Sequence, residues 1–319
     1  MADKIATRDS YGRALVELGA SDPNVVVLDA DLSGSTKSGE FKKAYPDRFF
    51  NAGIAECDLM GMATGLALSG KTAFASTFAM FATGRAYEII RNSIAYTGAN
   101  VKICATHAGL SVGEDGASHQ CLEDISLMRG LPGMTVLDPA DDVSARKLIK
   151  AAAEMQGPVY IRLGRAAVPV VYSEDDDIVI GKAVKLREGS DVTIMSTGNV
   201  LSEALAAADQ LAEEGIRAAV LDFHTIKPID EAAIIEAAKG DGGIVTVEDH
   251  FVTGGLGSAV AEVMAKQGLG CKVKMLGAQD RFGESGKPGE LYKEYGIDAA
   301  SIKQAATELC AWTKMNTAP

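Results

Sequence analysis

The chain has 319 residues, more than the about 250 to 300 that one hydrophobic core usually serves, so we expect two domains. Hydrophobic residues make up 47% of it and charged residues 23%, which is ordinary globular usage and argues against disorder. The net charge of −12 argues against nucleic acid and anionic membranes as partners, because both bind basic surfaces.

The cysteines and the beginning of the chain indicate a cellular compartment. Five cysteines are scattered without a Cys-x-x-Cys pair, which fits reduced thiols. The first residues contain no apolar segment of signal-peptide length, and no run of about 18 apolar residues occurs in the chain. We therefore expect a cytoplasmic protein that does not cross a membrane.

The first half of the chain alternates helices with strands. Apolar residues at helical spacing predict a first helix over 8–19. Further strands are predicted at 24–29, 72–77, 101–105, 134–138 and 159–163, with helices at 57–69, 85–97, 121–130 and 141–155. Apolar runs such as Val25 to Leu28 are typical of strands buried on both faces of a parallel sheet.

An acidic stretch from Glu174 to Asp177 interrupts this alternation, and we assign residues 169–190 to a linker. Beyond it, strands are predicted at 192–196, 218–223, 244–248 and 272–276, with helices at 200–214, 230–238, 257–267, 288–295 and 299–313. The predicted fold is α/β with two domains, 1–168 and 191–319, each a mainly parallel sheet with helices on both faces.

Two polar loops, 31–36 and 106–120, follow predicted strands. Ligands of parallel sheets bind outside the carboxyl ends of the strands, so both loops are candidate site loops. The second loop holds His107, Asp115 and His119 among three glycines, which let backbone turn sharply and approach a ligand. Taken alone, the segment suits a polar turn as well as a site.

Three short motifs match patterns of known binding sites, but the segments around them do not fit such sites. The segment Gly65 to Thr72 satisfies the P-loop pattern, but a helix precedes it and a strand follows, the reverse of the order that aims helix amides at phosphates. The segment Gly254 to Gly257 lacks the third glycine of a dinucleotide fingerprint and is typical of a helix start. Cys104 and His107 have no third ligand at a suitable spacing, so we expect this chain to supply no metal ligands.

Four segments together resemble the transketolase family of thiamine diphosphate enzymes. They are Asn51 to Glu56, Ser76 to Phe81, Thr106 with His107, and Gly113 to Gln120. The resemblance covers essentially the whole chain and implies a pyrimidine-binding domain followed by a transketolase carboxyl-terminal domain. The alternatives are a deoxyxylulose-phosphate-synthase-like enzyme, a two-oxoacid dehydrogenase β-subunit and a non-catalytic regulatory homologue.

The diphosphate-binding half of the family has no counterpart in the sequence. That half carries Gly-Asp-Gly and a downstream Asn, whereas Gly240-Asp241-Gly242 precedes a predicted strand and no Asn follows before Asn316. The resemblance therefore implies the carboxyl-terminal subunit of a split transketolase, with thiamine diphosphate and Mg²⁺ as cofactors. It also implies an amino-terminal partner chain that holds the metal, self-association through the family interface, and sugar phosphates as substrates.

The same resemblance implies a role for each site residue. Glu56 acts on the aminopyrimidine, and the two loop histidines move protons at sugar oxygens. The implied set is catalytic Glu56, His107 and His119; cofactor-binding Asp31, Glu56, Phe78 and Phe81; and substrate-binding Arg8, Ser35, Asp115 and Arg165. Ordinary structural roles are the alternative: a helix start for Glu56, core packing for the phenylalanines and a surface charge for Arg165.

Four positions depart from the family pattern. Cys57 replaces the His that usually follows the catalytic Glu, Ala108-Gly109 replaces Asp-Ser, and Gly84 replaces an aromatic residue. These departures affect the substrate assignment more than the cofactor assignment, which is compatible with a transketolase specialised for an unusual ketose phosphate.

Overall fold

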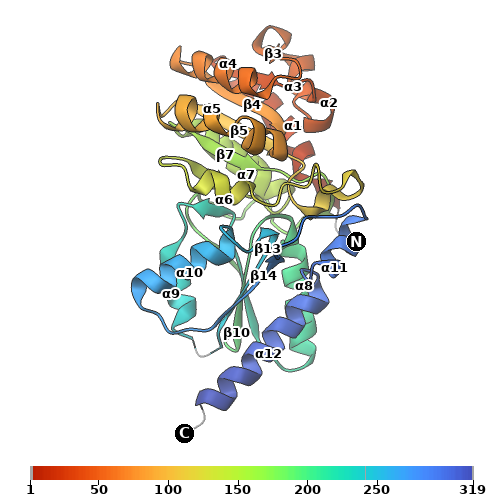
Figure 1. Ribbon diagram of the computed structural model, residues 1–319, viewed down its shortest axis with the longest axis vertical. Coiled ribbons are helices and arrows are strands. Elements are labelled where there is room, and N and C mark those ends of the chain that lie inside the picture. The colour runs from red at the N-terminus through yellow and green to blue at the C-terminus, as the bar shows by residue number, and fades with distance from the viewer. Residues whose placement is uncertain (1–2, 241, 318–319) are drawn as a thin grey trace.

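The computed structural model describes residues 3–240 and 242–317, with side chains described as far as residue 312. Two lobes lie one above the other, each built around a β-sheet (Figure 1). Asp241 of the Gly240-Asp241-Gly242 motif lies outside the described residues. No helix in the described part of the chain is both long and apolar enough to cross a membrane.

The upper sheet has seven strands, six of which are parallel and come from the first half of the chain. These six are β2 (Val25–Asp29), β3 (Phe49–Asn51), β4 (Thr72–Phe78), β5 (Val101–Thr106), β6 (Thr135–Leu137) and β7 (Val159–Arg162). Their spatial order is β6-β7-β5-β4-β2-β3. The seventh strand, β12 (Thr225–Lys227), comes from the second half and pairs antiparallel with β6.

Helices cover both faces of the upper sheet. Val27 of β2 packs in a hydrophobic cluster with α1 (Thr7–Ser21), whereas its neighbour Leu28 packs in a second cluster with α4 (Glu56–Leu68). Successive side chains of a strand point to opposite faces, so a strand covered on both sides is apolar throughout. The remaining helices are α2 (Ser33–Thr36), α3 (Gly39–Ala44), α5 (Tyr87–Ile89), α6 (Asp124–Arg129) and α7 (Asp142–Glu154).

The lower sheet has five strands in the order β14-β13-β10-β11-β9. They are β9 (Val184–Arg187), β10 (Val192–Ser196), β11 (Ala218–Asp222), β13 (Ile244–Phe251) and β14 (Val273–Ala278), and all except β9 are parallel. Figure 1 shows α9 (Glu231–Ala238) and α10 (Leu256–Gln267) on one side of this sheet, with α8 (Leu201–Glu213) and α12 (Ala299–Thr317) on the other. The predicted fold class is therefore confirmed for both halves.

The structure differs from the prediction where elements are short. β9 lies inside 169–190, so part of the predicted linker belongs to the lower sheet. β8 (Ala167–Pro169) pairs with β1 (Lys4–Ala6), and three residues are too few for an alternating pattern to be recognised. The predicted helix over 85–97 is α5 flanked by two π-helical turns, Phe81–Arg85 and Ile90–Ala95.

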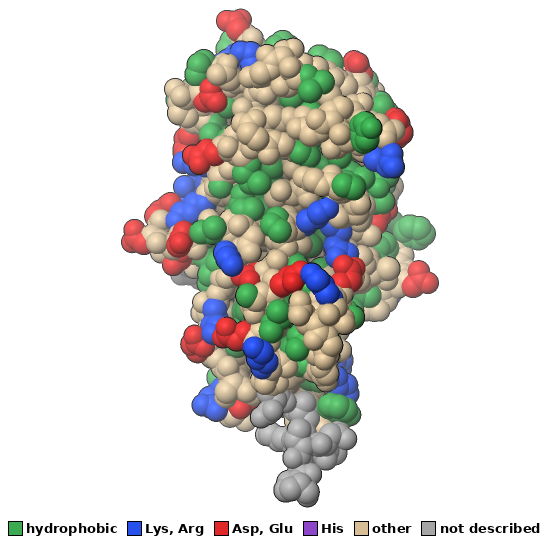
Figure 2. All heavy atoms as spheres, turned by 90° about the vertical axis from the view of Figure 1, so that its left-hand side faces the viewer, with side chains coloured by type: hydrophobic (Ala, Val, Ile, Leu, Met, Phe, Trp, Pro, Cys, Tyr) green, Lys and Arg blue, Asp and Glu red, His purple; other side chains and the backbone are tan. Residues whose placement is uncertain are grey.

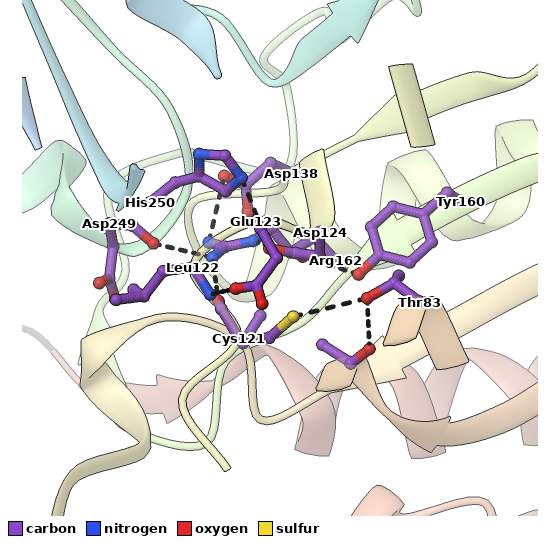
Figure 3. Close-up of polar contacts among 12 residues, drawn as sticks. Thr83, Cys121, Leu122, Glu123, Asp124, Asp138, Tyr160, Arg162, Asp249 and His250 are labelled. Atoms are coloured by element: carbon purple, nitrogen blue, oxygen red, sulfur yellow. Dashed lines mark hydrogen bonds and ion pairs between the residues drawn. The ribbon is translucent and has the colours of Figure 1, made fainter. Parts of the chain in front are cut away.

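A buried arginine joins the two domains, as Figure 3 shows. Arg162, at the end of β7, donates from Nε to Asp124 Oδ2 at 2.8 Å and from Nη2 to the carbonyl oxygen of Asp249 at 2.7 Å. Asp138 Oδ2 lies 3.7 Å from its Nη1, and the arginine side chain is only 4% exposed. Burial raises the pKa of Asp138 to about 7, and the charge of Arg162 opposes that rise. The guanidinium thus compensates carboxylates of the upper domain and binds the backbone of the lower one.

We predict that Arg162→Met lowers the free energy of unfolding by about 3 to 5 kcal/mol, because it leaves buried carboxylates without their cation. Chemical denaturation followed by circular dichroism measures this loss, and coincidence with a second probe checks that one transition is observed. Glu262→Gln is the control: Glu262 pairs with Arg129 but is 64% exposed, so its loss costs about 1 kcal/mol or less. Equal stability of the two variants would contradict the assigned role of Arg162.

Candidate active site

Aromatic rings meet where two neighbouring strands end. Phe78 is the last residue of β4, and its register partner on β5 is Thr106, which His107 follows. The rings of Phe78 and His107 stack with centroids 3.8 Å apart, and those of Phe78 and Phe81 stack at 5.8 Å. His119 meets Phe78 and Phe81 edge-on, at 6.2 and 5.6 Å. Four predicted site residues therefore form one wall at the carboxyl edge of the upper sheet.

The hydrogen bonds of His107 define which ring nitrogen carries its proton. Its Nε2 lies 3.3 Å from Nη1 of Arg8, and its Nδ1 lies 2.9 Å from Oγ1 of Thr106. Because an arginine only donates, Nε2 accepts, and the proton of the neutral ring lies on Nδ1. Burial, together with the positive charges of Arg8 and Arg165, lowers the pKa of His107 to about 3. The imidazole is therefore neutral at physiological pH.

Arg8 connects this wall to the loop after β2. Its Nη1 also donates to the carbonyl oxygen of Ser35 at 3.0 Å, and its Nε is buried with no acceptor among the described residues. Burial lowers the pKa of Arg8, and Arg165 adds to that effect, while the charges of Asp9 and, to a smaller extent, Asp115 oppose it. A cation with an unused donor suits an anionic ligand.

The loop that follows β5 is ordered by a short 3-10 helical turn, Leu110–Asp115. Gln120 holds it through Nε2, which donates to the carbonyl oxygens of Leu110 and Gly113 at 3.3 Å. Arg165 donates from Nη1 to the carbonyl oxygen of Val112 and lies 3.0 Å from Glu114 Oε2. The carboxylate of Asp115, at the end of the turn, is exposed.

Glu56 is the first residue of α4, and its side chain is only 3% exposed. Its Oε2 has no hydrogen-bond partner within the described ranges, and a buried oxygen without a donor costs free energy unless a ligand supplies one. The first turn of α4 contacts the segment that begins at Phe81, because Cys57 Sγ lies 3.6 Å from the carbonyl oxygen of Arg85. A flat ring bearing a protonated nitrogen fits these residues, since Glu56 would accept its hydrogen bond and aromatic faces would pack on it.

Asp31 lies apart from these contacts. Its backbone is left-handed (φ 63°), and its carboxylate accepts a hydrogen bond from Asn51 Nδ2 at 2.9 Å. Neither Asp31 nor Glu56 makes a hydrogen bond or ring contact with the His107 wall in the part of the chain that the structure describes. Both residues follow strand ends and so lie at the same edge of the sheet as the aromatic wall, but they do not contact it directly.

Four residues at the site were not assigned roles from the sequence. Thr106 and Gln120 belong to the family motifs named above. The sequence therefore indicated that they lie near the site, but not which groups they contact. Asn51 begins another quoted motif. Asp249, which binds the loop from the other domain, carries only the weak signal of an acid at the end of a buried strand.

Two of the short motifs whose context excluded a binding site have structural roles. Gly70 has a positive φ of 92° at the end of α4 and leads into β4, so the P-loop pattern spans a helix end, as predicted. The amides of Leu256 and Gly257, which begin α10, donate to the Glu248 carboxylate at 2.7 and 2.8 Å. Among the described residues, no group of three or more His, Cys, Asp and Glu side chains is placed to hold a metal ion.

Comparison with known proteins assigns the family. The model of the transketolase pyrimidine-binding domain matches residues 3–170, and that of the transketolase C-terminal domain matches residues 181–302. The chain belongs to the transketolase family. The resemblance inferred from the sequence is therefore confirmed.

Similar proteins include separate carboxyl-terminal sections of transketolase. The chain is 52% identical to a putative transketolase C-terminal section of Methanocaldococcus jannaschii, over 94% of this chain and 95% of that one. It is 41% identical to a 6-deoxy-6-sulfo-D-fructose transketolase subunit of a Clostridium species, over 95% and 94%. Against human transketolase it is 42% identical over 97% of its own length but 50% of the human chain. It therefore corresponds to the carboxyl-terminal half of full-length transketolases.

A solved structure supports the same correspondence. A split-gene transketolase described as an inactive β4 tetramer superposes with a TM-score of 0.90 at 53% identity, covering 96% of this chain and 99% of the other. The chain thus matches a separately encoded transketolase subunit over nearly its whole length.

We predict that His107 stays neutral far below the usual histidine range and that Arg8→Gln raises its pKa, because burial and then Arg8 are the main causes of the depression. Titration of the ring proton signals by NMR measures the midpoint, expected near pH 3 in the unaltered chain. Arg13→Gln is the control, since Arg13 lies on the same helix but pairs with Asp142. A midpoint near 6.5 in the unaltered chain would contradict the prediction.

Proposed function

We propose that this chain is the carboxyl-terminal subunit of a thiamine-diphosphate-dependent transketolase, which moves a two-carbon ketol unit from a ketose phosphate to an aldose acceptor. The observation that carries the proposal is a buried oxygen of Glu56 that has no hydrogen-bond partner among the described residues. It lies at the start of α4, whose first turn contacts the segment that begins at Phe81. The family of the chain supports the proposal. We further propose that residues 1–168 form its first domain, that residues 191–319 together with β9 form its second, and that it works in the cytoplasm.

For the cofactor, we assign the aminopyrimidine to Glu56, Phe78 and Phe81, with Asp31 facing the same group. Thiamine diphosphate supplies, when bound, the carbanion that accepts and releases the two-carbon unit. The Glu56 carboxylate would hold a proton at the pyrimidine nitrogen and would thereby support the base chemistry that the cofactor supplies. The phenylalanine rings orient the pyrimidine and exclude water from it.

For the sugar, we assign the anionic end to Arg8, Ser35 and Arg165, and a hydroxyl to Asp115. A cleft of about 780 Å³ between the domains is lined by both arginines, which supports this assignment. His119 is only partly buried and lies at the edge of the aromatic wall, which suits proton transfer at a sugar oxygen. We assign His107 to the same catalytic group. Because its ring is neutral, it suits hydrogen bonding, and it also orients Arg8.

We propose that an amino-terminal partner chain completes the site by holding the diphosphate and Mg²⁺. Three large apolar side chains of the upper domain are well exposed and suit an interface: Ile54 (78%), Leu68 (64%) and Tyr96 (89%). Seen from the side on which α5 and α9 lie in Figure 1, the upper lobe carries few charged side chains, whereas they are frequent lower down (Figure 2). A related split-gene transketolase forms an inactive β4 tetramer, which supports a need for a partner.

We predict that Glu56→Gln lowers ketol transfer by the complete enzyme about 100-fold or more, because an amide cannot hold the pyrimidine proton as a carboxylate does. Steady-state kinetics at saturating thiamine diphosphate measure the loss. Asp58→Asn, which changes an exposed acid in the same helical turn, is the matched control and should retain activity. Unchanged turnover in Glu56→Gln would remove Glu56 from the catalytic group.

We predict that ketol transfer requires this chain together with a partner that carries Gly-Asp-Gly and a downstream Asn. Each chain alone should be inactive, and the mixture should bind thiamine diphosphate in the presence of Mg²⁺, as isothermal titration would measure. Pyruvate decarboxylation with acyl transfer to a lipoyl domain would instead indicate a two-oxoacid dehydrogenase subunit. Full turnover of the mixture after replacement of both Glu56 and His119 would indicate a regulatory chain.

A further inference from the structure

The second domain reaches the site loop through one carboxylate. Asp249, near the end of β13, accepts hydrogen bonds from the backbone N–H groups of Leu110 (2.6 Å to Oδ1) and Ser111 (3.2 Å to Oδ2). These residues begin the turn Leu110–Asp115. The first N–H groups of a helical turn have no partners within it, so this carboxylate satisfies them from another domain.

Gly109 makes the close approach of this carboxylate possible. A Cβ atom at this position would lie 2.4 Å from Asp249 Oδ2, and the backbone φ is +79°. Glycine alone avoids both the clash and the strain. Gly109 is one of the positions at which the chain departs from the family pattern. In this protein, the glycine at that position leaves room for the Asp249 carboxylate.

Other contacts from the second domain hold the same loop. The Tyr292 hydroxyl, on α11 (Pro288–Glu294), lies 3.2 Å from Asp249 Oδ2 and donates to it. Gln120, which binds the loop carbonyls, also donates from Nε2 to the carbonyl oxygen of Glu284 at 2.9 Å. Two segments of the second domain, besides β13, therefore contribute to the hydrogen bonds that hold the turn.

Asp249 is itself rigidly placed. Its side chain is buried, and Arg162, at the centre of the network in Figure 3, binds its carbonyl oxygen, so the residue is held in place. Burial raises the pKa of Asp249, whereas Arg162 and the loop N–H groups oppose that rise. A carboxylate offers two acceptor atoms, and here they receive three donors.

We propose that Asp249 is a positioning residue for sugar binding: it fixes the turn that ends in Asp115 and leads on to His119. This inference rests on the proposed function, because it gives the loop a sugar to bind. Asp249, in the domain where the sequence indicated no site, thereby acts on the reaction through the loop.

The test compares Asp249→Asn with Asp222→Asn in the complete enzyme. An asparagine keeps one acceptor but turns an N–H toward a loop donor, so the backbone amides of Leu110 and Ser111 should exchange with deuterium about tenfold faster. The KM for the ketose phosphate should rise about tenfold, while the affinity for thiamine diphosphate stays unchanged, because the cofactor residues lie outside the turn. Gly109→Ala should reproduce both effects from the other side of the contact.

Asp222→Asn controls for the loss of a buried carboxylate. Asp222 is also buried at the end of a lower-sheet strand, but it binds the Tyr172 hydroxyl and has no hydrogen bond to the loop. Its pKa is raised to about 8, mainly by burial, so the amide resembles the form that prevails at neutral pH. The control should leave loop exchange and KM unchanged.

Two results would overturn the inference: unchanged loop exchange in Asp249→Asn, or faster exchange with unchanged kinetics. If the unaltered enzyme shows no ketol transfer at all, the proposed function fails while the exchange measurement still decides whether Asp249 fixes the loop. The two failures are therefore distinguishable.

Discussion

A guanidinium removed from water needs several oxygen acceptors, and Arg162 finds them in both domains. It binds the carboxylate of Asp124, the first residue of α6, and the backbone of Asp249 on β13. The same Asp249 binds the start of the site loop, so one buried charge sets the domain contact and, through it, the loop. Breaking such a pair leaves an uncompensated buried charge, which makes this arrangement far less tolerant of substitution than a surface pair.

The two domains also bury acids whose pKa values lie well above the usual range. Burial raises the pKa of Asp222 to about 8 and that of Glu248 to about 7. Since the unfolded values lie near 4, the folded state holds protons that the unfolded chain releases. Their contribution to the free energy of unfolding is full below about pH 4 and is lost as pH rises through 7 to 8. Burial lowers the pKa of His250 to about 4, so its dependence on pH has the opposite sign. Its contribution to the free energy of unfolding is full above about pH 6.5 and is lost as pH falls through about 4.

Local patterns predicted much of the fold because each signal lies within one segment. The run from Val25 to Leu28 is apolar since both of its faces are covered, and the glycines around Leu110 mark the loop. The strand Thr225–Lys227 could not be predicted, because its partner β6 lies in the other half of the chain and its own pattern is three residues long. Asp249 was missed for a similar reason: the groups that it binds are distant in the sequence, and an acid at the end of a strand carries no sign of its partner. The residue assignments drawn from family motifs stay predictions, although most of them converge on one edge of the sheet.

His107 links the anion-binding end of the proposed site to its aromatic wall. After burial, the charges of Arg8 and Arg165 are the next causes that lower its pKa, and both arginines are assigned to the anionic end of the sugar. A bound phosphate would offset those charges, so the pKa of His107 would rise on binding. Because burial is the largest cause and remains, the pKa would stay below the usual 6.5. The ring would therefore remain neutral with its proton on Nδ1, which keeps its Nε2 lone pair on Arg8 while the sugar is held.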